Sequence, residues 1–174
     1  TGTLTMDNIT LVKHINAHAK DDEDVLRTAY ISSYFQTGLR GVLESAILKH
    51  EHMSLGAYKK IDEIPFDFDR RILSVIINDH KATKIITKGA PESILDRCNR
   101  FEIDGKVSSL TSARKAILRD EYDKLSADGL RVLAIAYNNY STAHKKSFST
   151  EDEKDLIFKG FVCFIDPPKP TVKD

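Results

Sequence analysis

One short segment brings together residue types suited to binding a phosphate. Lys88-Gly89-Ala90-Pro91-Glu92 places a lysine at the end of a predicted strand, followed by a glycine and a proline. The glycine lets a ligand approach the backbone, and a helix beginning at Pro91 would offer free amides that favour negative charge. A Lys-Gly pair at such a turn is more often only a turn, so this segment alone assigns no function.

Signatures of several other catalytic and binding sites are absent from the sequence. It contains no G-x-x-x-x-G-K-[ST], which excludes a P-loop as the mode of nucleotide binding. It also contains neither the G-x-G-x-x-G dinucleotide-binding turn nor the G-x-S-x-G nucleophile elbow. His14 and His18 are four residues apart with no cysteine nearby, so we expect surface histidines and no metal site. The acidic run from Asp21 to Asp24 is interpreted as a helix start.

Composition places few further limits on function. Of 174 residues, 41% are apolar and 30% charged, and 26 basic side chains balance 26 acidic ones. Such a chain has no general electrostatic reason to bind nucleic acid or an anionic membrane. No apolar run approaches the length of a bilayer span. Cys98 and Cys163 are isolated, which predicts reduced, partly buried thiols rather than a disulfide.

Hydrophobic periodicity predicts an α+β domain with a mainly antiparallel sheet, because hairpin-joined strands alternate with small groups of helices. Helices are predicted after Asp24, from Leu39 to Ile47, from Pro91 and from Thr111 to Leu125. The hydrophobic period changes from Tyr58 onward, and strands are predicted at Ile9–Lys13, Ile72–Ile77, Thr83–Lys88, Leu130–Tyr137 and Leu156–Ile165. A turn at Asn78-Asp79-His80-Lys81 would join the second and third of these strands, and Phe101–Val107 is predicted to form a small hairpin around Asp104-Gly105. Both ends look cut, and the prolines after Asp166 predict a boundary or hinge.

Four segments together resemble the P-type ATPases. Lys88–Glu92 resembles their ATP-site signature, and Gly129–Ala134 resembles their strand near the nucleotide. Thr1–Thr5 looks like the tail of their Asp-Lys-Thr-Gly-Thr-Leu-Thr phosphorylation motif, and Asp166-Pro167-Pro168 looks like their hinge. Because the four segments occur in the family's order and span the chain, the chain is identified as a member. The resemblance implies the nucleotide-binding-domain fold, a twisted, mainly antiparallel sheet flanked by helices.

The resemblance also implies a division of the chain. Residues 1–13 would be the tail of the phosphorylation segment and a hinge strand, residues 14–162 the nucleotide-binding domain, and residues 163–174 the hinge back to the phosphorylation domain.

The family pattern assigns an adenine end to the expected site. Phe66 stands where the family places the ring that stacks on adenine, and Glu44 matches an acidic residue at the adenine end. From periodicity alone, Glu44 lies toward the polar side of its helix. Leu133 would form an apolar wall.

The phosphate end follows from the same resemblance. Lys88 and Gly89 would line the pocket next to adenine and phosphate, and Arg71 and Arg131 would reach the phosphates. Phe68 departs from the pattern, because calcium pumps carry an arginine at this position.

The implied function is to hold Mg-ATP and present its γ-phosphate, by hinge bending, to an aspartate on a separate phosphorylation domain. That aspartate is outside this sequence, so no catalytic residue is assigned here and the chain alone is expected to be inactive. Mg²⁺ would arrive with ATP. The expected partners are the phosphorylation, actuator and transmembrane domains of one bacterial inner-membrane protein, and we expect the isolated domain to be monomeric.

The transported ion is assigned by resemblance alone. Tyr34–Leu39, Val42–Ile47 and Phe66–Arg71 look most like bacterial magnesium-transporting P-type ATPases. The alternatives are a calcium or proton pump, or a nucleotide-free interaction domain of the same fold. A free-standing kinase is disfavoured by the absence of a catalytic-base motif.

Overall fold

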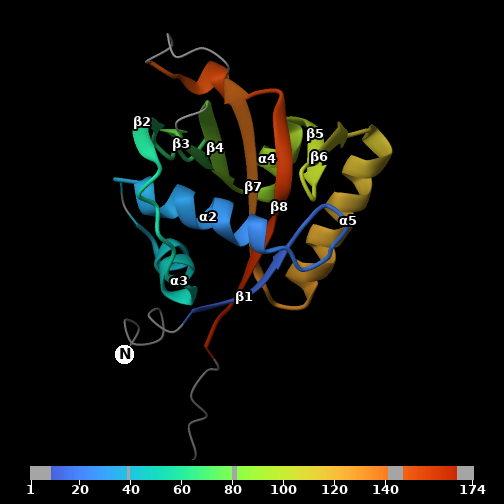
Figure 1. Ribbon diagram of the computed structural model, residues 1–174. Helices are drawn as coiled ribbons and strands as arrows, with labels where there is room; N and C mark the ends of the chain where they lie inside the picture. The colour runs from blue at the N-terminus through green and yellow to red at the C-terminus, as the bar shows by residue number, and fades with distance from the viewer. Residues whose placement is uncertain (1–8, 39, 80–81, 141–146, 168–174) are drawn as a thin grey trace, which may run out of the picture.

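Apolar stretches rich in β-branched and aromatic residues form the middle of a large sheet. A computed structural model describes residues 9–38, 40–79, 82–140 and 147–167 (Figure 1). Strands β3 (Ile72–Asn78), β4 (Thr83–Gly89) and β8 (Leu156–Ile165) are buried along almost their whole length. Such continuous burial requires cover on both faces of the sheet.

The sheet has eight strands in the order β2-β3-β4-β7-β8-β5-β6, with β1 also pairing β8. Every pairing is antiparallel except that of β5 with β8. This confirms the predicted α+β class. The remaining strands are β1 (Thr10–Ile15), β2 (Lys59–Ile64), β5 (Cys98–Ile103), β6 (Lys106–Ser109) and β7 (Arg131–Tyr140).

Helices cover both faces of the sheet. Asp22 caps α2 and Thr111 caps α5, each accepting a hydrogen bond from a backbone N–H of the first turn. Helices α2 and α3 pack over one face, where they share a hydrophobic cluster with the sheet, and α4 and α5 cover the other (Figure 1). The helical segments are α2 (Glu23–Phe35), α3 (Val42–His50), α4 (Pro91–Asp96), α5 (Ser112–Ala127) and the 3₁₀ turn η1 (Thr150–Asp152).

Most predicted elements are confirmed within a few residues of their predicted ends. The predictions for one histidine and for the cysteines were wrong. His14 is buried and not a surface histidine, and both cysteines are fully buried free thiols rather than partly buried ones. A bulge between Leu11 and Lys13 shifts the alternation of β1, and His14 then points inward beside Ile15.

Several predictions fall outside the described residues, namely those on Thr1–Thr5, Leu39, the turn at His80 and Lys81, and the segment from Pro168 onward. Within the described residues, every helix is too short or too polar to span a bilayer. The proposed boundaries at 13/14 and 162/163 lie within β1 and β8, which pair with each other.

Candidate functional site

Two cavities adjoin at the loop between β2 and β3. One has a volume of about 400 Å³ and the other about 350 Å³. Both are lined by Glu44, Phe66, Phe68 and Leu73, so the two phenylalanines stand between them. Volumes of this size are typical of small-molecule sites.

The structure brings six of the seven predicted site residues to the smaller cavity. They come from α3, the β2–β3 loop, β4 and β7, and they are Glu44, Phe66, Arg71, Lys88, Gly89 and Leu133. Arg131 is not among the residues lining either cavity. Phe68, Leu73, Pro91, Tyr122 and Val132 also line the smaller cavity, and sequence reasoning had not assigned them to it.

Phe66 and Phe68 are exposed although they are large and apolar. Phe66 is 48% exposed and Phe68 89%. Their rings meet edge to face, with centroids 5.5 Å apart and an interplanar angle of 86°. Each therefore supports the other while leaving aromatic surface open at the cavity rim, where a planar ligand can stack.

Arg70 holds the loop that carries these rings. Its Nε donates to Glu153 Oε1 at 2.8 Å, and Nη2 donates to the carbonyls of Pro65 at 3.1 Å and Ile72 at 3.3 Å. The sequence analysis assigned no role to Arg70 or to Glu153. Because the two residues are 83 positions apart, no local sequence pattern signals the pair.

Lys88 lies beneath the cavity and is almost completely buried. Its Nζ donates to Ser33 Oγ and Gln36 Oε1, both at 3.1 Å, and lies 3.4 Å from Glu44 Oε1. Burial lowers the pKa of Lys88 to about 8, although the Glu44 carboxylate acts in the opposite direction. The ammonium is thus engaged by α2 and α3 rather than directed at open space.

Glu44 shares this buried environment, since only 14% of its side chain is exposed. The expectation that it faces away from the packed side of its helix was therefore wrong. Its pairing with Lys88 orients the carboxylate at the junction of the two cavities.

Gly89 is required by the packing of its own chain. A Cβ at this position would lie 2.3 Å from the carbonyl oxygen of Arg71, and φ is +158°. Arg71 itself has a positive φ of 59°, and its carbonyl accepts a hydrogen bond of 3.1 Å from the Ala90 N–H. The close approach observed here is thus between β4 and the start of β3.

The two arginines predicted to contact phosphates both have carboxylate partners at the surface. Arg71 lies 3.5 Å from Glu92, in the first turn of α4, and Arg131 lies 3.1 Å from Asp166. All four side chains are about half exposed, so these pairs are weak and can open for a more highly charged anion.

Comparisons with known proteins identify the family of the chain. The family model described as P-type ATPase, cytoplasmic domain N, matches residues 11–171. The chain is 38% identical over 177 residues to a protein named Magnesium-transporting ATPase, P-type 1, of Escherichia coli K12, covering 98% of this chain and 20% of that protein. It is 32% identical over 197 residues to Calcium-transporting ATPase 1 of Lactococcus lactis, covering 100% of this chain and 22% of that protein.

The chain therefore spans about a fifth of the length of the curated relatives it matches. The family match covers nearly the whole chain, and the magnesium-transporting relative is similar along the same length. From these matches, the chain belongs to the cytoplasmic domain N family of the P-type ATPases.

Proposed function

We propose that this domain binds Mg-ATP and presents the γ-phosphate to an aspartate on a separate phosphorylation domain of a P-type cation-transporting ATPase. The observation that carries the proposal is the exposed Phe66 ring at the rim of a cavity whose wall includes Glu44 and Leu133. These residues come from three separate segments, and the fold gathers them at one place.

At the adenine end, Phe66 would stack on the base, a contact worth about 1–3 kcal/mol in comparable sites. Leu133 would cover part of the same ring system as an apolar wall. The Glu44 carboxylate would accept a hydrogen bond from the exocyclic amine of adenine, and its pairing with Lys88 holds it in position. Lys88 then acts mainly through Glu44 and through the floor of the cavity.

At the phosphate end, Arg71 is the nearer of the two candidate cations because it lines the cavity beside Gly89. It would exchange Glu92 for phosphate oxygens, which carry more charge. Arg131 would contribute from β7 when Asp166 releases it. Mg²⁺ would enter bound to the triphosphate, neutralising charge between phosphate oxygens.

Closure of the two domains would complete the reaction site. We propose that residues 1–13 and 163–174 connect residues 14–162 to the phosphorylation domain. The pairing of β1 with β8 supports this, since it brings the two connecting segments side by side. Hinge bending at these segments would carry the bound nucleotide to the acceptor aspartate, and the isolated chain would bind ATP without hydrolysing it.

A chemical-shift titration with Mg-ATP tests the nucleotide site. Since half of a closing site lacks its partner's contacts, we expect a Kd on the order of 0.1–1 mM, or about −4 to −5.5 kcal/mol. Phe66→Ala should remove most of this binding. Tyr34→Ala is the matched control, because Tyr34 is 49% exposed but lines neither cavity at the loop. Equal affinity of wild type and Phe66→Ala would show that the adenine assignment is wrong.

We further propose that the full-length protein lies in a bacterial inner membrane, with this domain in the cytoplasm, and transports Mg²⁺. The magnesium-transporting name and 38% identity of the Escherichia coli relative support this ion over Ca²⁺, for which the Lactococcus relative at 32% is named. The full-length protein should restore growth at low magnesium to cells lacking magnesium uptake. Rescue of a calcium-transport or proton-transport mutant instead would show that the assignment of Mg²⁺ is wrong, and would leave the proposed ATP site unaffected.

A further inference from the structure

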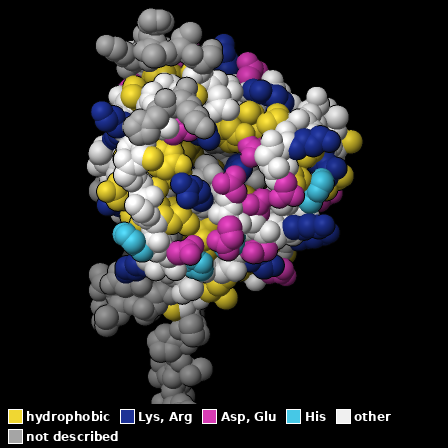
Figure 2. Space-filling view, viewed as in Figure 1, with side chains coloured by type: hydrophobic (Ala, Val, Ile, Leu, Met, Phe, Trp, Pro, Cys, Tyr) yellow, Lys and Arg dark blue, Asp and Glu magenta, His cyan; other side chains and the backbone are white. Residues whose placement is uncertain are grey.

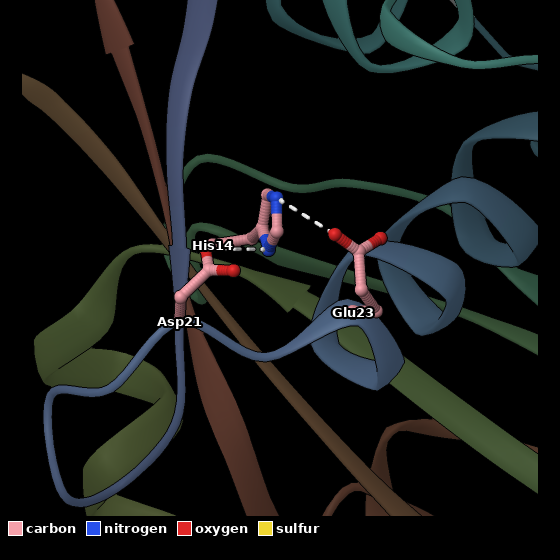
Figure 3. Close-up of side chains that lie close together, drawn as sticks. All are labelled: His14, Asp21 and Glu23. Carbon is pink, nitrogen blue, oxygen red and sulfur yellow. Dashed lines mark ion pairs between the residues drawn. The ribbon is translucent and has the colours of Figure 1, made fainter.

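A second cluster of polar groups lies where β1 meets the start of α2, outside both cavities at the β2–β3 loop. Figure 3 shows His14 between Asp21 and Glu23. Its Nδ1 is 3.3 Å from Asp21 Oδ1, and its Nε2 is 3.8 Å from Glu23 Oε1. One ligand atom from each residue can be chosen so that all lie within 4.8 Å of one another.

The two nitrogens of His14 have different roles. Nδ1 lies 3.0 Å from the carbonyl oxygen of Asp22, and because a carbonyl only accepts, Nδ1 carries the hydrogen. In the neutral ring, Nε2 then has a free lone pair. Among the described residues Nε2 has no hydrogen-bond partner, and the Glu23 carboxylate that it faces is too far for a hydrogen bond.

This leaves two electron-rich atoms facing each other, one on the His14 side chain, which is only 10% exposed, and one on the Glu23 carboxylate, which is 72% exposed. Such an arrangement is favourable when a cation lies between them. A histidine that donates one ring N–H to a backbone carbonyl, leaving the other nitrogen free, has the orientation found in metal-ligating histidines.

The neighbouring carboxylates differ in whether they already have hydrogen-bond or ion-pair partners other than His14. Asp22 accepts from the Asp24 N–H and from Asn16, and Asp24 pairs with Lys159. Asp21 and Glu23 are 74% and 72% exposed and can turn toward an ion from solvent. Figure 2 shows acidic side chains gathered on the face that carries the start of α2, which favours the approach of a cation.

We propose that His14 Nε2, Asp21 and Glu23 form a binding site for a divalent transition-metal ion, with Zn²⁺ the best match. Zinc takes one imidazole and two carboxylates readily, with water as a fourth ligand, and its bond lengths place neighbouring ligand atoms roughly 3.4 Å apart. The imidazole ligand disfavours Mg²⁺ and Ca²⁺, which take oxygen ligands. The site is independent of the proposed nucleotide function.

An ion here would connect β1 to α2 through side chains on both. Metal binding should therefore raise the thermal stability of the chain, because only the folded state brings the three ligands together.

Cobalt titration of the 174-residue chain tests the site, because Co²⁺ in a low-coordinate protein site absorbs visible light. We expect absorption that saturates at one equivalent and is abolished by one equivalent of Zn²⁺, but not by a large excess of Mg²⁺. Glu23→Gln and Asp21→Asn should each weaken Zn²⁺ binding at least about tenfold, since disturbing even an outer-shell partner has effects of that size. His14→Gln should do the same.

His18→Gln is the matched control, because His18 is an exposed histidine on the same segment and outside the cluster. It should bind as the wild type does. If His14→Gln does not fold, the two exposed carboxylate variants decide the question. Wild-type Zn²⁺ affinity in both carboxylate variants, an equal loss in His18→Gln, or displacement of Co²⁺ by equimolar Mg²⁺ would each overturn the proposal.

Discussion

Arg70 and Glu153 lie 83 residues apart in sequence and form an ion pair whose carboxylate is fully buried, with Nε and Oε1 2.8 Å apart. Glu153 also accepts a hydrogen bond of 2.6 Å from Ser74 on β3. The pair therefore joins the segment before β8 both to the sheet and to the loop that carries Phe66. The geometry of the proposed adenine end depends on this contact.

Arg70→Met should lower the free energy of unfolding by about 3–5 kcal/mol, because it leaves a buried carboxylate without its charge partner. It should also weaken ATP binding by releasing the loop. Urea denaturation and the ATP titration measure the two effects.

The matched control is Arg119→Met, since Arg119 pairs with Asp96 at 3.0 Å on an exposed surface. That change should lower the free energy of unfolding by less than about 1 kcal/mol. Similar losses in the two variants would contradict the structural role assigned to Arg70.

Lys88 should make stability depend on pH in an identifiable window. Its pKa is about 8 in the folded chain and 10.5 as the ordinary value, so between these values the unfolded chain binds more protons. The contribution of this group to the free energy of unfolding must then rise with pH between these two values. As the pH rises from about 8 to 10.5, the free energy of unfolding of the wild type should therefore increase relative to that of Lys88→Met. Urea denaturation at several pH values measures this difference.

Lys159→Met is the control for that experiment. Burial lowers the pKa of Lys159, but its hydrogen bonds to Asp24 and Glu102 outweigh this effect, and the net pKa is raised. The stabilisation that Lys159 contributes is lost only above pH 10.5. Between pH 8 and 10.5, the free energy of unfolding of the wild type should therefore not increase relative to that of Lys159→Met. A pH-independent difference between wild type and Lys88→Met would contradict the lowered pKa.

Gly89→Ala should destabilise the chain by about 3 kcal/mol or more, because the new Cβ meets the Arg71 carbonyl and the backbone has a positive φ. Gly105→Ala is the control. Gly105 also has a positive φ, of 81°, but a Cβ there meets no atom within 4 Å, so about 1–2 kcal/mol is expected. Thermal unfolding of both variants makes the comparison, and equal losses would show that the close approach is unimportant.

The chain alone should not form a phosphoenzyme. In the proposed function, the acceptor aspartate belongs to a separate phosphorylation domain, so no residue described here is expected to accept the phosphoryl group. Incubation with γ-labelled ATP should therefore give no acid-stable labelled protein and no hydrolysis above background. Stoichiometric labelling of any residue would indicate a different reaction.

The sequence by itself determined the elements and the family. Apolar periodicity marks β3, β4 and β8 because strand burial depends mainly on local residue type. The Asp22 and Thr111 caps are likewise signalled locally, since a cap acts within its own first turn. The segment Lys88–Glu92 pointed to the family because its residues are adjacent in the chain.

Only the tertiary structure decided which charges meet. Glu44 and Lys88, and also Arg70 and Glu153, pair across elements distant in sequence, so no spacing rule predicts them. The inward position of His14 depends on a bulge in the pairing of β1 with β8, which alternation in the sequence does not show. Burial then changes the chemistry of Lys88, because removing water lowers its pKa. The packing of β1 against the start of α2 likewise places one nitrogen of His14 opposite the Glu23 carboxylate.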